Sequence, residues 1–438
     1  MSNLAELRSA AREIFDAALR GVEVETAVRR VIQFTESHFS VCDIPIDARP
    51  VYAVAIGKAA LSMSEAFEQS LGQVFKSGVL VGPSPNLAQA EWLSQSRWNW
   101  YVGGHPLPNR ESLSAAADAV GLLQRADRER GLIVFLISGG GSAMMEWPAT
   151  GNITLTDLQD ANRVLVNCGA SISEINSVRR AFSAVKGGKL AERAPNCDQI
   201  TLIVSDVPGR EAYNVASGPT IKPAAGSPDA HDVIARYSLR SHLPAKIVEA
   251  IDSLREFHTD SHSQREQFVL LSNDDAVRSA AAAAERRGFM VEIATDISDP
   301  PIAEGCEMLA RRLQALRAQR SGVQVCLISG GEFACPVKGD GIGGRNLETA
   351  LRLALLSRSN EADFVALCAG TDGVDGNSPA AGAIIDNSTI DRGDTMQLDA
   401  NDFLQRSDAY HFFEALSDAI TTGPTGTNVR DLRILVIG

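Results

Sequence analysis

A short apolar segment that stops at consecutive glycines limits the folds open to this chain. Val134–Ile137 is followed by Ser138, then by Gly139, Gly140 and Gly141, and then by Ser142. The apolar run is too short for a helix and lacks polar alternation, so it predicts a strand buried on both faces. Glycines after such a strand allow a tight turn whose N–H groups approach an anionic ligand. Open α/β sheets bind their ligands at this position.

Nearly the same phrase recurs later in the chain, as Val325–Ser329 followed by Gly330, Gly331 and Glu332. One glycine turn is common, but two matching copies in 438 residues favour two α/β domains, because a single core rarely grows so large. We expect an N-terminal Rossmann-like α/β domain over residues 1–235 and a smaller C-terminal α/β domain over 240–438. Residues 223–229 have the composition of a linker.

Composition and charge exclude several classes of function. The formal net charge of -13 argues against nucleic acid or an anionic membrane as the main partner, since both are bound through basic patches. The apolar runs are far shorter than the about 20 residues that span a bilayer. Seven cysteines without CxxC spacing predict reduced residues, and the segment 1–6 lacks a signal-peptide pattern. These features predict a soluble cytoplasmic protein.

Apolar periodicity predicts helices over Leu4–Leu19 and Val22–Phe39. Val51–Ile56 then predicts a strand, which is followed by a glycine turn and by a helix that begins with Lys58. A lysine in the first turn opposes the helix dipole, and such local violations are expected at functional sites. A solvated lysine is the alternative. His105, beside two glycines and a proline, is a weaker acid/base candidate and more often a structural turn donor.

Two further candidates precede the linker. Ile200–Val204 predicts a buried strand that delivers Asp206 to its carboxyl end, where a carboxylate can hold Mg²⁺ or accept a proton. A capping aspartate is the less favoured interpretation. Two lysines flank a glycine pair in Lys186–Lys189, which indicates either close backbone approach to a ligand or an ordinary cationic helix end.

The C-terminal half contains a glycine-rich loop that enters an apolar helix. This loop, Lys338–Gly344, leads into Arg345 and Asn346. Helix N-termini bind phosphates through free N–H groups, and arginine adds a planar fork for phosphoryl oxygens. The spacing is not a Walker A motif, because no Gly-Lys-Ser/Thr follows. Asp372 and Asp375, on a later strand-end loop, suit an oxygen-ligated cation, although plain turns also carry such residues.

At this point the chain resembles a known family, the class II glycerate kinases or glycerate 2-kinases, some of which were once labelled hydroxypyruvate reductases. The similar stretches run in order along essentially the whole chain: Ala55–Ala59, Gly104–Pro108, Ser138–Ala143, Glu174–Arg179, Lys186–Leu190, Ser205–Gly209, Ala216–Thr220, Gly330–Glu332, Gly343–Asn346, Ala369–Gly373 and Thr422–Asn428. Each motif is weak alone, but this number of them together is specific.

The resemblance implies transfer of the ATP γ-phosphoryl group to the 2-hydroxyl of D-glycerate, with Mg²⁺ required. It implies two α/β domains with the active site in the interdomain cleft, and family residues proposed to be catalytic map onto Lys58 and Arg345. The chain departs from the family at Leu347, where glutamine is common, at Phe333–Cys335, which replaces a threonine-rich run, and at Arg210–Glu211, which replaces an acidic pair. These departures bear on which acceptor is preferred.

The resulting hypothesis assigns a role to each candidate. Lys58, Arg345 and Asp206 are expected to be catalytic, and the acceptor carboxylate is expected at Ser138, Gly139, Gly140, Gly141, Ser142 and Arg179. The expected nucleotide contacts are Lys189, Gly330, Gly331, Glu332, Gly343, Gly344, Asn346, Thr371, Asp372 and Gly373. The expected Mg²⁺ ligands are Asp206, Asp372 and Asp375.

Two alternatives remain open from the sequence. A nicotinamide-dependent hydroxypyruvate reductase needs a Gly-x-Gly-x-x-Gly turn between strand and helix, and neither glycine-rich turn has that register at a strand end. A non-catalytic sensor of sugar acids or nucleotides is the second alternative, and it would retain ATP without consuming it. A small-molecule substrate is expected, with no nucleic acid or membrane partner, and the oligomeric state is left open, with a homodimer as one option.

Overall fold

The computed structural model describes residues 3–34, 39–47, 49–207, 209–253, 263–319, 322–358 and 362–438. Pro208, part of the expected turn after the strand that delivers Asp206, lies outside the described residues, as do the first two residues of the chain. The chain divides into two compact units. The larger is Val24–Leu270, and the smaller combines Met1–Glu23 with Leu271–Gly438.

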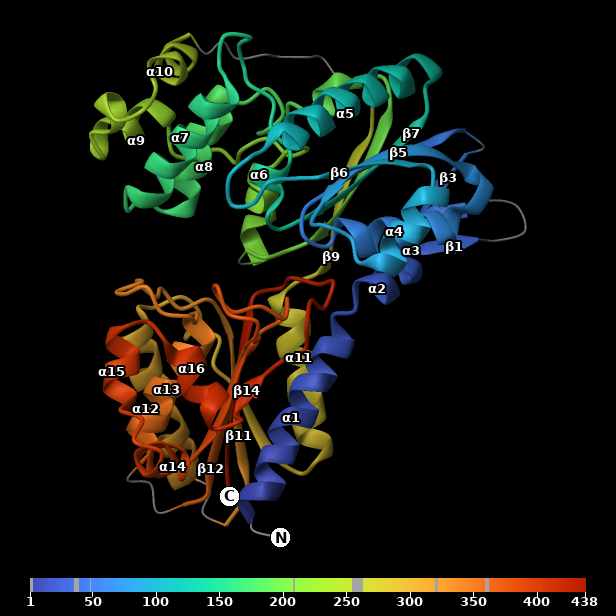
Figure 1. Ribbon diagram of the computed structural model, residues 1–438. Helices are drawn as coiled ribbons and strands as arrows, with labels where there is room; N and C mark the ends of the chain where they lie inside the picture. The colour runs from blue at the N-terminus through green and yellow to red at the C-terminus, as the bar shows by residue number, and fades with distance from the viewer. Residues whose placement is uncertain are drawn as a thin grey trace. The chain divides into compact units, whose positions relative to one another are not determined.

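These units differ from the expected division at residues 235 to 240. Helix α1 (Asn3–Gly21) belongs to the C-terminal unit, where it lies beside α11 (Asn273–Arg286), as Figure 1 shows. A Cβ built on Gly21 would meet the Ser279 hydroxyl of α11, so the two helices pack closely. Residues 240–270 belong to the larger unit, because α10 (Ala245–Asp252) packs there against α7 (Leu155–Asn167) and α8 (Ile172–Phe182). The apolar periodicity of the sequence predicted the first helix, but it did not show which elements that helix packs against.

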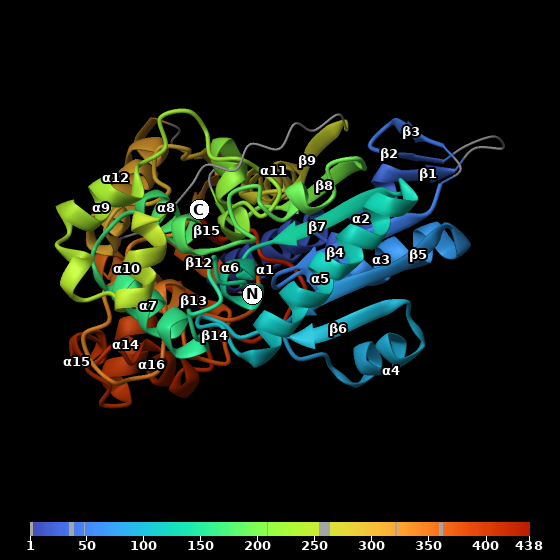
Figure 2. The same cartoon turned by 90° about the horizontal axis from the view of Figure 1, so that it is seen from above.

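The larger unit is built on a six-stranded sheet in the order β6-β5-β4-β7-β8-β9. Neighbouring strands from β6 to β8 are parallel, which confirms the predicted Rossmann-like sheet, and they lie side by side in Figure 2. Its strands are β4 (Val51–Ile56), β5 (Phe75–Gly82), β6 (Trp98–Val102), β7 (Leu132–Ser138), β8 (Asp198–Val204) and β9 (Arg265–Leu271), and the helices and turns between them are α3 (Ala60–Leu71), η1 (Gly72–Val74), α4 (Leu87–Gln95), α5 (Arg110–Glu129) and α6 (Gly141–Met144).

Both faces of this sheet are covered, as the apolar run in β7 predicted. Every residue of β7 is buried. Tyr52, Val54 and Phe135 pack with alanines of α5 on one face, while α3 contacts β4, β5 and β7. Because parallel strands end at the same edge, the turns after β4, β7 and β8 are brought together.

The second predicted helix, Val22–Phe39, is shorter than expected. Helix α2 (Val24–Val31) ends where the chain enters a small antiparallel sheet of β1 (Ile32–Phe34), β2 (Phe39–Val41) and β3 (Ile44–Ile46). Ile32 pairs with Val41 and Phe34 with Phe39. The β-branched and aromatic side chains near the end of the predicted helix therefore lie in β-strands, which residues of this type favour.

A separate helical layer completes the larger unit. Its apolar core includes Leu158, Leu165, Phe182 and Ile247, and it is distinct from the core of the sheet. The helices of this layer are α7 (Leu155–Asn167), α8 (Ile172–Phe182), α9 (Ala230–Arg236), η4 (Leu239–Ser241) and α10 (Ala245–Asp252). The short segments η2 (Ala191–Arg193) and η3 (Gly209–Ser217) contribute residues to the core of the sheet instead.

The smaller unit has a mixed sheet in the order β10-β11-β15-β12-β13-β14. The last strand of the chain, β15, lies in the middle and runs antiparallel to both β11 and β12. Its elements after α11 are β10 (Met290–Ile293), α12 (Ile302–Gln319), β11 (Val325–Gly331), α13 (Arg345–Ser357), β12 (Phe364–Gly370), β13 (Gly382–Asp386), α14 (Thr389–Thr395), α15 (Ala400–Gln405), α16 (Ala409–Ala415), β14 (Ala419–Ile420) and β15 (Asp431–Ile437).

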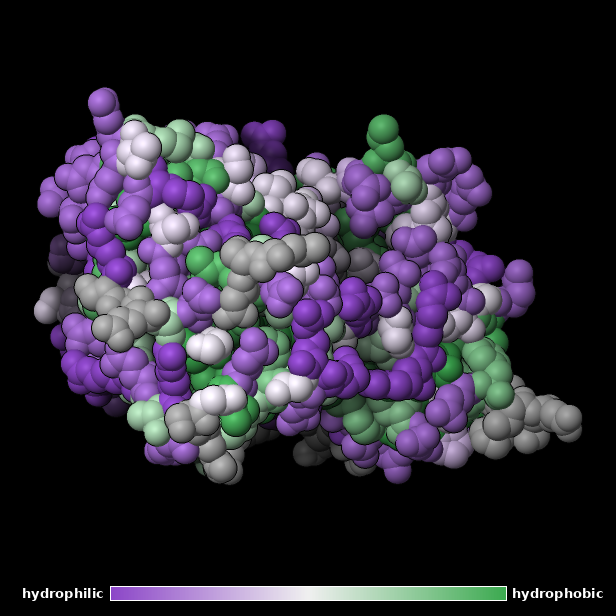
Figure 3. Space-filling model, turned by 90° about the horizontal axis from the view of Figure 1, so that it is seen from below, coloured by the Kyte–Doolittle hydropathy of each residue, from purple (hydrophilic) through white to green (hydrophobic). Residues whose placement is uncertain are grey.

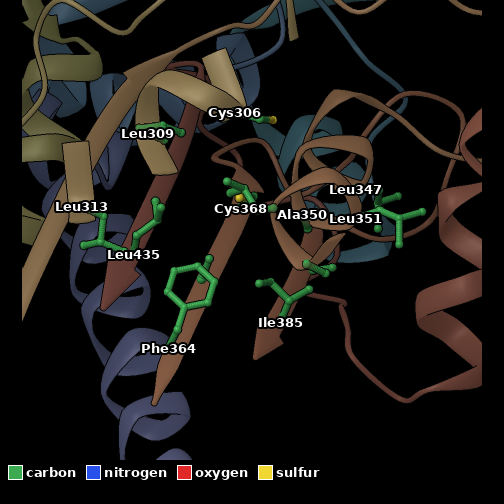
Figure 4. Packing of buried hydrophobic residues seen from close by; sticks show 14 of the residues in the cluster. Cys306, Leu309, Leu313, Leu347, Ala350, Leu351, Phe364, Cys368, Ile385 and Leu435 are labelled. Atoms are coloured by element: carbon green, nitrogen blue, oxygen red, sulfur yellow. The ribbon is translucent and has the colours of Figure 1, made fainter. Parts of the chain in front are cut away.

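Alternate residues of these strands enter one core. Phe364, Cys368 and Leu435 face the helix side chains of Leu309 and Leu351 (Figure 4). Helix α1 contacts β12 and β15, and helix α11 contacts β11 and β15. Hydrophilic residues cover much of the face in Figure 3, with hydrophobic residues in smaller groups between them. Among the described residues, none of the helices combines the length and apolarity that a membrane crossing requires.

Candidate active site

The glycine turn after β7 is joined to the turn after β4 by backbone hydrogen bonds. The Lys58 N–H donates to the Gly139 carbonyl at 2.8 Å, and the Ala59 N–H donates to Ser138 Oγ at 3.0 Å. Ser138 Oγ in turn donates to the Ile56 carbonyl at 3.3 Å. Ser138 is fully buried, so its hydroxyl fixes the two strand ends rather than facing a ligand.

The same turn gathers three of the predicted side chains. A Cβ built on Gly139 would lie 1.8 Å from Asp206 Oδ2, so only glycine lets this carboxylate pack on the turn. A Cβ on Gly140 would lie 3.1 Å from Cγ of Lys58 and 3.3 Å from Cδ2 of His105. Lys58 lies in the turn before α3, and not within the helix as expected. A cation, a carboxylate and an imidazole therefore surround a glycine turn.

A hydrogen-bonded chain links this turn to α8. Ser142 Oγ lies 2.7 Å from Ser217 Oγ, which donates to Asn176 Oδ1 at 2.8 Å. Arg180, one turn further along α8, donates to Asn214 Oδ1 at 2.6 Å. The face of α8 that carries Asn176 and Arg180 is thus tied to the loop that borders the turn.

Arg179 and Lys189 make structural contacts within the larger unit. Arg179 Nε donates to Asn162 Oδ1 at 2.8 Å, and burial lowers the pKa of its guanidinium group. Lys189 Nζ donates to the carbonyls of Arg180 and Ser183 at 2.7 and 2.6 Å, and burial lowers the pKa of Lys189 to about 8. The lysine therefore satisfies carbonyls at the end of α8, which is the second of the two interpretations left open.

The second glycine turn lies at the edge where β11 and β12 end and β15 begins. Arg345, the first residue of α13, donates from Nε to Asp431 Oδ2 at 2.6 Å, and its Nη2 lies 2.8 Å from Glu332 Oε1. Burial acts to lower the pKa of Arg345, but the Asp431 and Glu332 carboxylates outweigh it and the pKa is raised. The guanidinium group is thus held by two carboxylates.

Asp375 caps the helix that carries Arg345. Its Oδ1 accepts from the Asn346 N–H at 3.1 Å and from Asn346 Nδ2 at 3.2 Å, and its Oδ2 accepts from the Leu347 N–H at 2.8 Å. Burial raises the pKa of Asp375 to about 7, although these hydrogen bonds lower it. A Cβ on Gly344 would clash with this carboxylate. Asp375 was expected to bind metal, but its oxygens are engaged by the helix N-terminus.

The other glycines of this edge have polar neighbours. A Cβ on Gly330 would lie 1.8 Å from Asn273 Oδ1, which also accepts the Gly331 N–H at 2.9 Å. The Gly343 N–H donates to Asn377 Oδ1 at 2.9 Å. Asn273 also donates to the carbonyls of Val429 and Asp431. An amide side chain therefore joins the β11 turn to the start of β15.

Polar side chains also collect around the end of β12. A Cβ on Gly370 would lie within 3.5 Å of side-chain atoms of Asp372, Asp431 and Asn346. Thr371 is turned away from this group, because its hydroxyl donates to the Arg430 carbonyl at 2.7 Å. Asp372 also receives a hydrogen bond from the Val374 N–H at 3.2 Å.

The loop of residues 422–428 is held against the end of β12 by backbone contacts. A Cβ built on Gly373 would lie 2.0 Å from the Gly423 carbonyl oxygen, and the Thr425 hydroxyl donates to the Thr371 carbonyl at 2.6 Å. The Ala369–Gly373 and Thr422–Asn428 motifs therefore meet in the structure.

Sequence reasoning missed several residues of these two edges. Asp431 is the first residue of the terminal strand, and its acidic side chain before an apolar run was the available signal. Asn176 and Ser217 lie in two of the stretches that resemble the family, but no pattern pairs them or singles out Asn273, because their partners are distant in the sequence. Within the part of the chain that the structure describes, groups of three or more His, Cys, Asp or Glu side chains arranged to hold a metal are absent.

The chain is similar to known proteins along most of its length. Residues 10–252 match the family described as Domain of unknown function (DUF4147), and residues 325–431 match the MOFRL family. A D-glycerate 2-kinase from Thermotoga maritima is 36% identical over 88% of this chain and 90% of its own. A protein from Agrobacterium vitis with a provisional hydroxypyruvate reductase name is 34% identical over 98% of this chain and 94% of its own. A crystal structure of glycerate kinase from Thermotoga maritima has a TM-score of 0.82 and 31% identity, covering 99% of this chain and 100% of that one.

Proposed function

The chain belongs to the glycerate kinase family, and from this premise we propose that it transfers the γ-phosphoryl group of ATP to the 2-hydroxyl of D-glycerate. The product would be 2-phospho-D-glycerate. Support for this position on the acceptor comes from the name of the Thermotoga maritima relative, a D-glycerate 2-kinase.

The observation that carries the proposal is the surroundings of the first glycine turn. Lys58 and Asp206 both approach this turn, at Gly140 and Gly139. A small hydroxy acid needs donors for its carboxylate and a group that orients its hydroxyl. We assign the carboxylate to the turn formed by Ser138–Ser142, with Arg179 as a further cation, and the hydroxyl to Asp206.

Phosphoryl transfer requires positioning and neutralisation of charge more than covalent chemistry. We assign both Lys58 and Arg345 to neutralising phosphoryl charge, Lys58 at the first glycine turn and Arg345 at the edge of the smaller unit. Arg345 suits this role because its guanidinium group is oriented by Asp431 and Glu332 before any ligand arrives. A pre-oriented charge costs little reorganisation during the reaction.

The edge of the smaller unit fits a nucleotide phosphate chain. The N-terminus of α13, which begins with Arg345, lies at this edge, and the positive end of a helix dipole attracts phosphate. Mg²⁺ in kinases is usually held by one or two carboxylates together with phosphate oxygens and water, so a cage of three side chains is not needed. Asp372 would hold it at this edge, and the ion would offset phosphate charge.

The proposal is tested by following ADP release from ATP and Mg²⁺ with D-glycerate, L-glycerate, threonate and tartrate as separate acceptors. The product is identified by ³¹P NMR. Release with D-glycerate and a 2-phosphate product is the expected result. A 3-phosphate product would correct the acceptor position, and release with another acid alone would correct the substrate.

The hydroxypyruvate reductase name of the Agrobacterium vitis relative supports one rival activity. The same preparation is therefore assayed for NADH and NADPH oxidation with hydroxypyruvate. Oxidation without ADP release in the first assay would replace the kinase proposal with the reductase. ATP binding without turnover would favour the sensor.

A further inference from the structure

A buried ion pair lies behind the first glycine turn and has no part in the roles assigned above. Lys186 Nζ contacts the Glu146 carboxylate, and each residue is 1% exposed. Burial lowers the pKa of the Lys186 ammonium group, and the nearby Glu146 carboxylate opposes this effect. Burying two charges costs several kcal/mol for each ion, so an apolar pair of similar size would often stabilise the fold as well or better.

The carboxylate end of this pair is fixed by its own hydrogen bonds. Glu146 Oε1 accepts from Ser183 Oγ at 2.6 Å and from the Trp147 N–H at 3.0 Å. The lysine of the pair, unlike the glutamate, also borders the glycine turn. Lys186 lines a small pocket together with Gly141 and Ala216, and Glu146 is not among the residues that line it.

This pocket places the lysine of the pair beside the proposed carboxylate site. Gly141 belongs to the Ser138–Ser142 turn, and Ile56, from the end of β4, forms another part of the pocket wall. Arg179 also acts electrostatically on both Lys186 and Glu146, so a second cation lies close to the pair. Charges in such a water-poor region act more strongly on their surroundings than charges in water.

We propose that the Lys186–Glu146 pair is a positioning element that makes the Ser138–Ser142 turn selective for an acceptor bearing a carboxylate. The pair acts through the turn: its positive end raises the affinity of the turn amides for negative charge, and Glu146 holds the ammonium group in place. This inference rests on the proposed function, and it names the charge of the acceptor as the property that the pair selects.

The test uses the full chain with both charges removed, as K186M/E146L. This double substitution keeps the side-chain volume approximately and leaves neither charge unpaired, so we expect it to fold. A charge-reversed double variant, K186E/E146K, keeps a buried ion pair but exchanges its two charges, so that the carboxylate occupies the position that borders the glycine turn. Thermal melting and circular dichroism establish that each variant is folded.

Affinity for D-glycerate is measured by calorimetry, and KM and kcat by ADP release. We expect K186M/E146L to weaken D-glycerate binding about tenfold with little change in kcat, because the carboxylate interaction is the same in the ground and transition states. The reversed pair should weaken binding further. Binding of glycerol, which has no carboxylate, should be equally poor in all three proteins.

An unchanged affinity for D-glycerate in folded K186M/E146L would overturn the inference and leave the pair a structural feature. Equal affinities of the neutral and reversed variants would overturn it as well, since polarity would then not matter. If the parent protein fails to bind D-glycerate, the inference falls with the acceptor assignment. If it binds D-glycerate but releases no ADP, the kinase proposal alone is overturned.

Discussion

The Ser-Gly-Gly phrase occurs in both units, and the two copies make different contacts. In the larger unit, the Ser138 hydroxyl joins β7 to the turn after β4, and the Asp206 carboxylate packs on Gly139. In the smaller unit, Ser329 Oγ donates to the Ile297 carbonyl at 2.6 Å, and the Asn273 amide packs on Gly330.

The sheets around the two turns explain this difference. Strand β7 lies between parallel strands, so its turn meets two other strand ends of the same kind. Strand β11 has the antiparallel β15 as one neighbour, which brings Arg433 beside the turn. Arg433 is buried, stacks on Phe333 with its Cζ 3.8 Å from the ring centroid, and donates to the Gly330 carbonyl.

The comparison shows that a glycine turn determines where a backbone can approach a ligand, while its neighbours decide the chemistry. The first turn has ionisable groups, Lys58 and Asp206, against its glycines. The second is held by Asn273 and Arg433, and Arg345, the arginine proposed to act on phosphate, is already paired with carboxylates. We therefore expect substitutions at the first turn to affect turnover and those at the second to affect stability as well.

The largest expected effect comes from removing either cation. K58A and R345A should each lower kcat by about 10² to 10⁴, a range typical for loss of a group that stabilises transition-state charge. Exposed residues provide matched controls, and K76A and R358A should retain the parent kcat. Turnover within a few-fold of the parent in K58A or R345A would remove that residue from the proposed mechanism.

The second edge should respond to pH through Asp375. Its pKa is about 7 in the folded protein, above the value of 3.8 for an ordinary aspartate, so the folded state binds the proton more tightly. The contribution of Asp375 to stability therefore falls as pH rises from about 4 to 7, by about 1.4 kcal/mol for each pKa unit.

D375N removes this titration. Its melting temperature relative to that of the parent protein should rise between pH 4 and pH 8, measured by calorimetry at each pH. A constant difference across this range would show that Asp375 does not titrate there. D363N, which changes an aspartate outside the cap of α13, serves as the control.

Alanine at the two matched glycines separates the roles of the turns. G139A forces Asp206 aside, and we expect kcat to fall about as far as in D206A while the melting temperature changes little. G330A forces Asn273 from its three backbone hydrogen bonds, which should cost about 1–3 kcal/mol of unfolding free energy. The reverse pattern in chemical denaturation and kinetics would contradict the comparison.

The smallest effects are expected at the two serines. S138A and S329A each remove a buried, hydrogen-bonded hydroxyl, and we expect each to lose about 1 kcal/mol of stability in urea unfolding. Only S138A should also lower kcat, because its partner Ala59 follows Lys58 directly. An equal loss of kcat in S329A would show that the second turn is as closely coupled to the chemistry as the first.

Much of the local structure was readable from residue patterns. The apolar run before Ser138 predicted a strand buried on both faces, and the glycine-rich loop before Arg345 predicted a helix entrance. Lys58, Asp206 and the Ser138–Ser142 turn were singled out separately, and the structure gathers them at one sheet edge. Strand order explains this, because parallel strands all deliver their carboxyl ends to the same edge.

Other features depended on partners that lie far away in the sequence. Helix α1 was predicted correctly, but its face fits α11, about 270 residues later, and periodicity does not identify such a partner. Likewise, Arg345 was expected to face phosphate, while the two carboxylates that hold it come from the ends of β11 and β15. Asp375 looked like a metal ligand until the N-terminus of α13 was seen to engage its oxygens.

The sequence by itself determined the class of fold, the positions of the glycine turns, and most residues proposed for catalysis, because these follow from local backbone freedom and from the burial of short apolar runs. The tertiary structure alone decided which charges face each other. Ion pairs such as Lys186–Glu146 and Arg345–Asp431 form across long stretches of chain. Their strength depends on burial and distance, which a linear sequence does not specify.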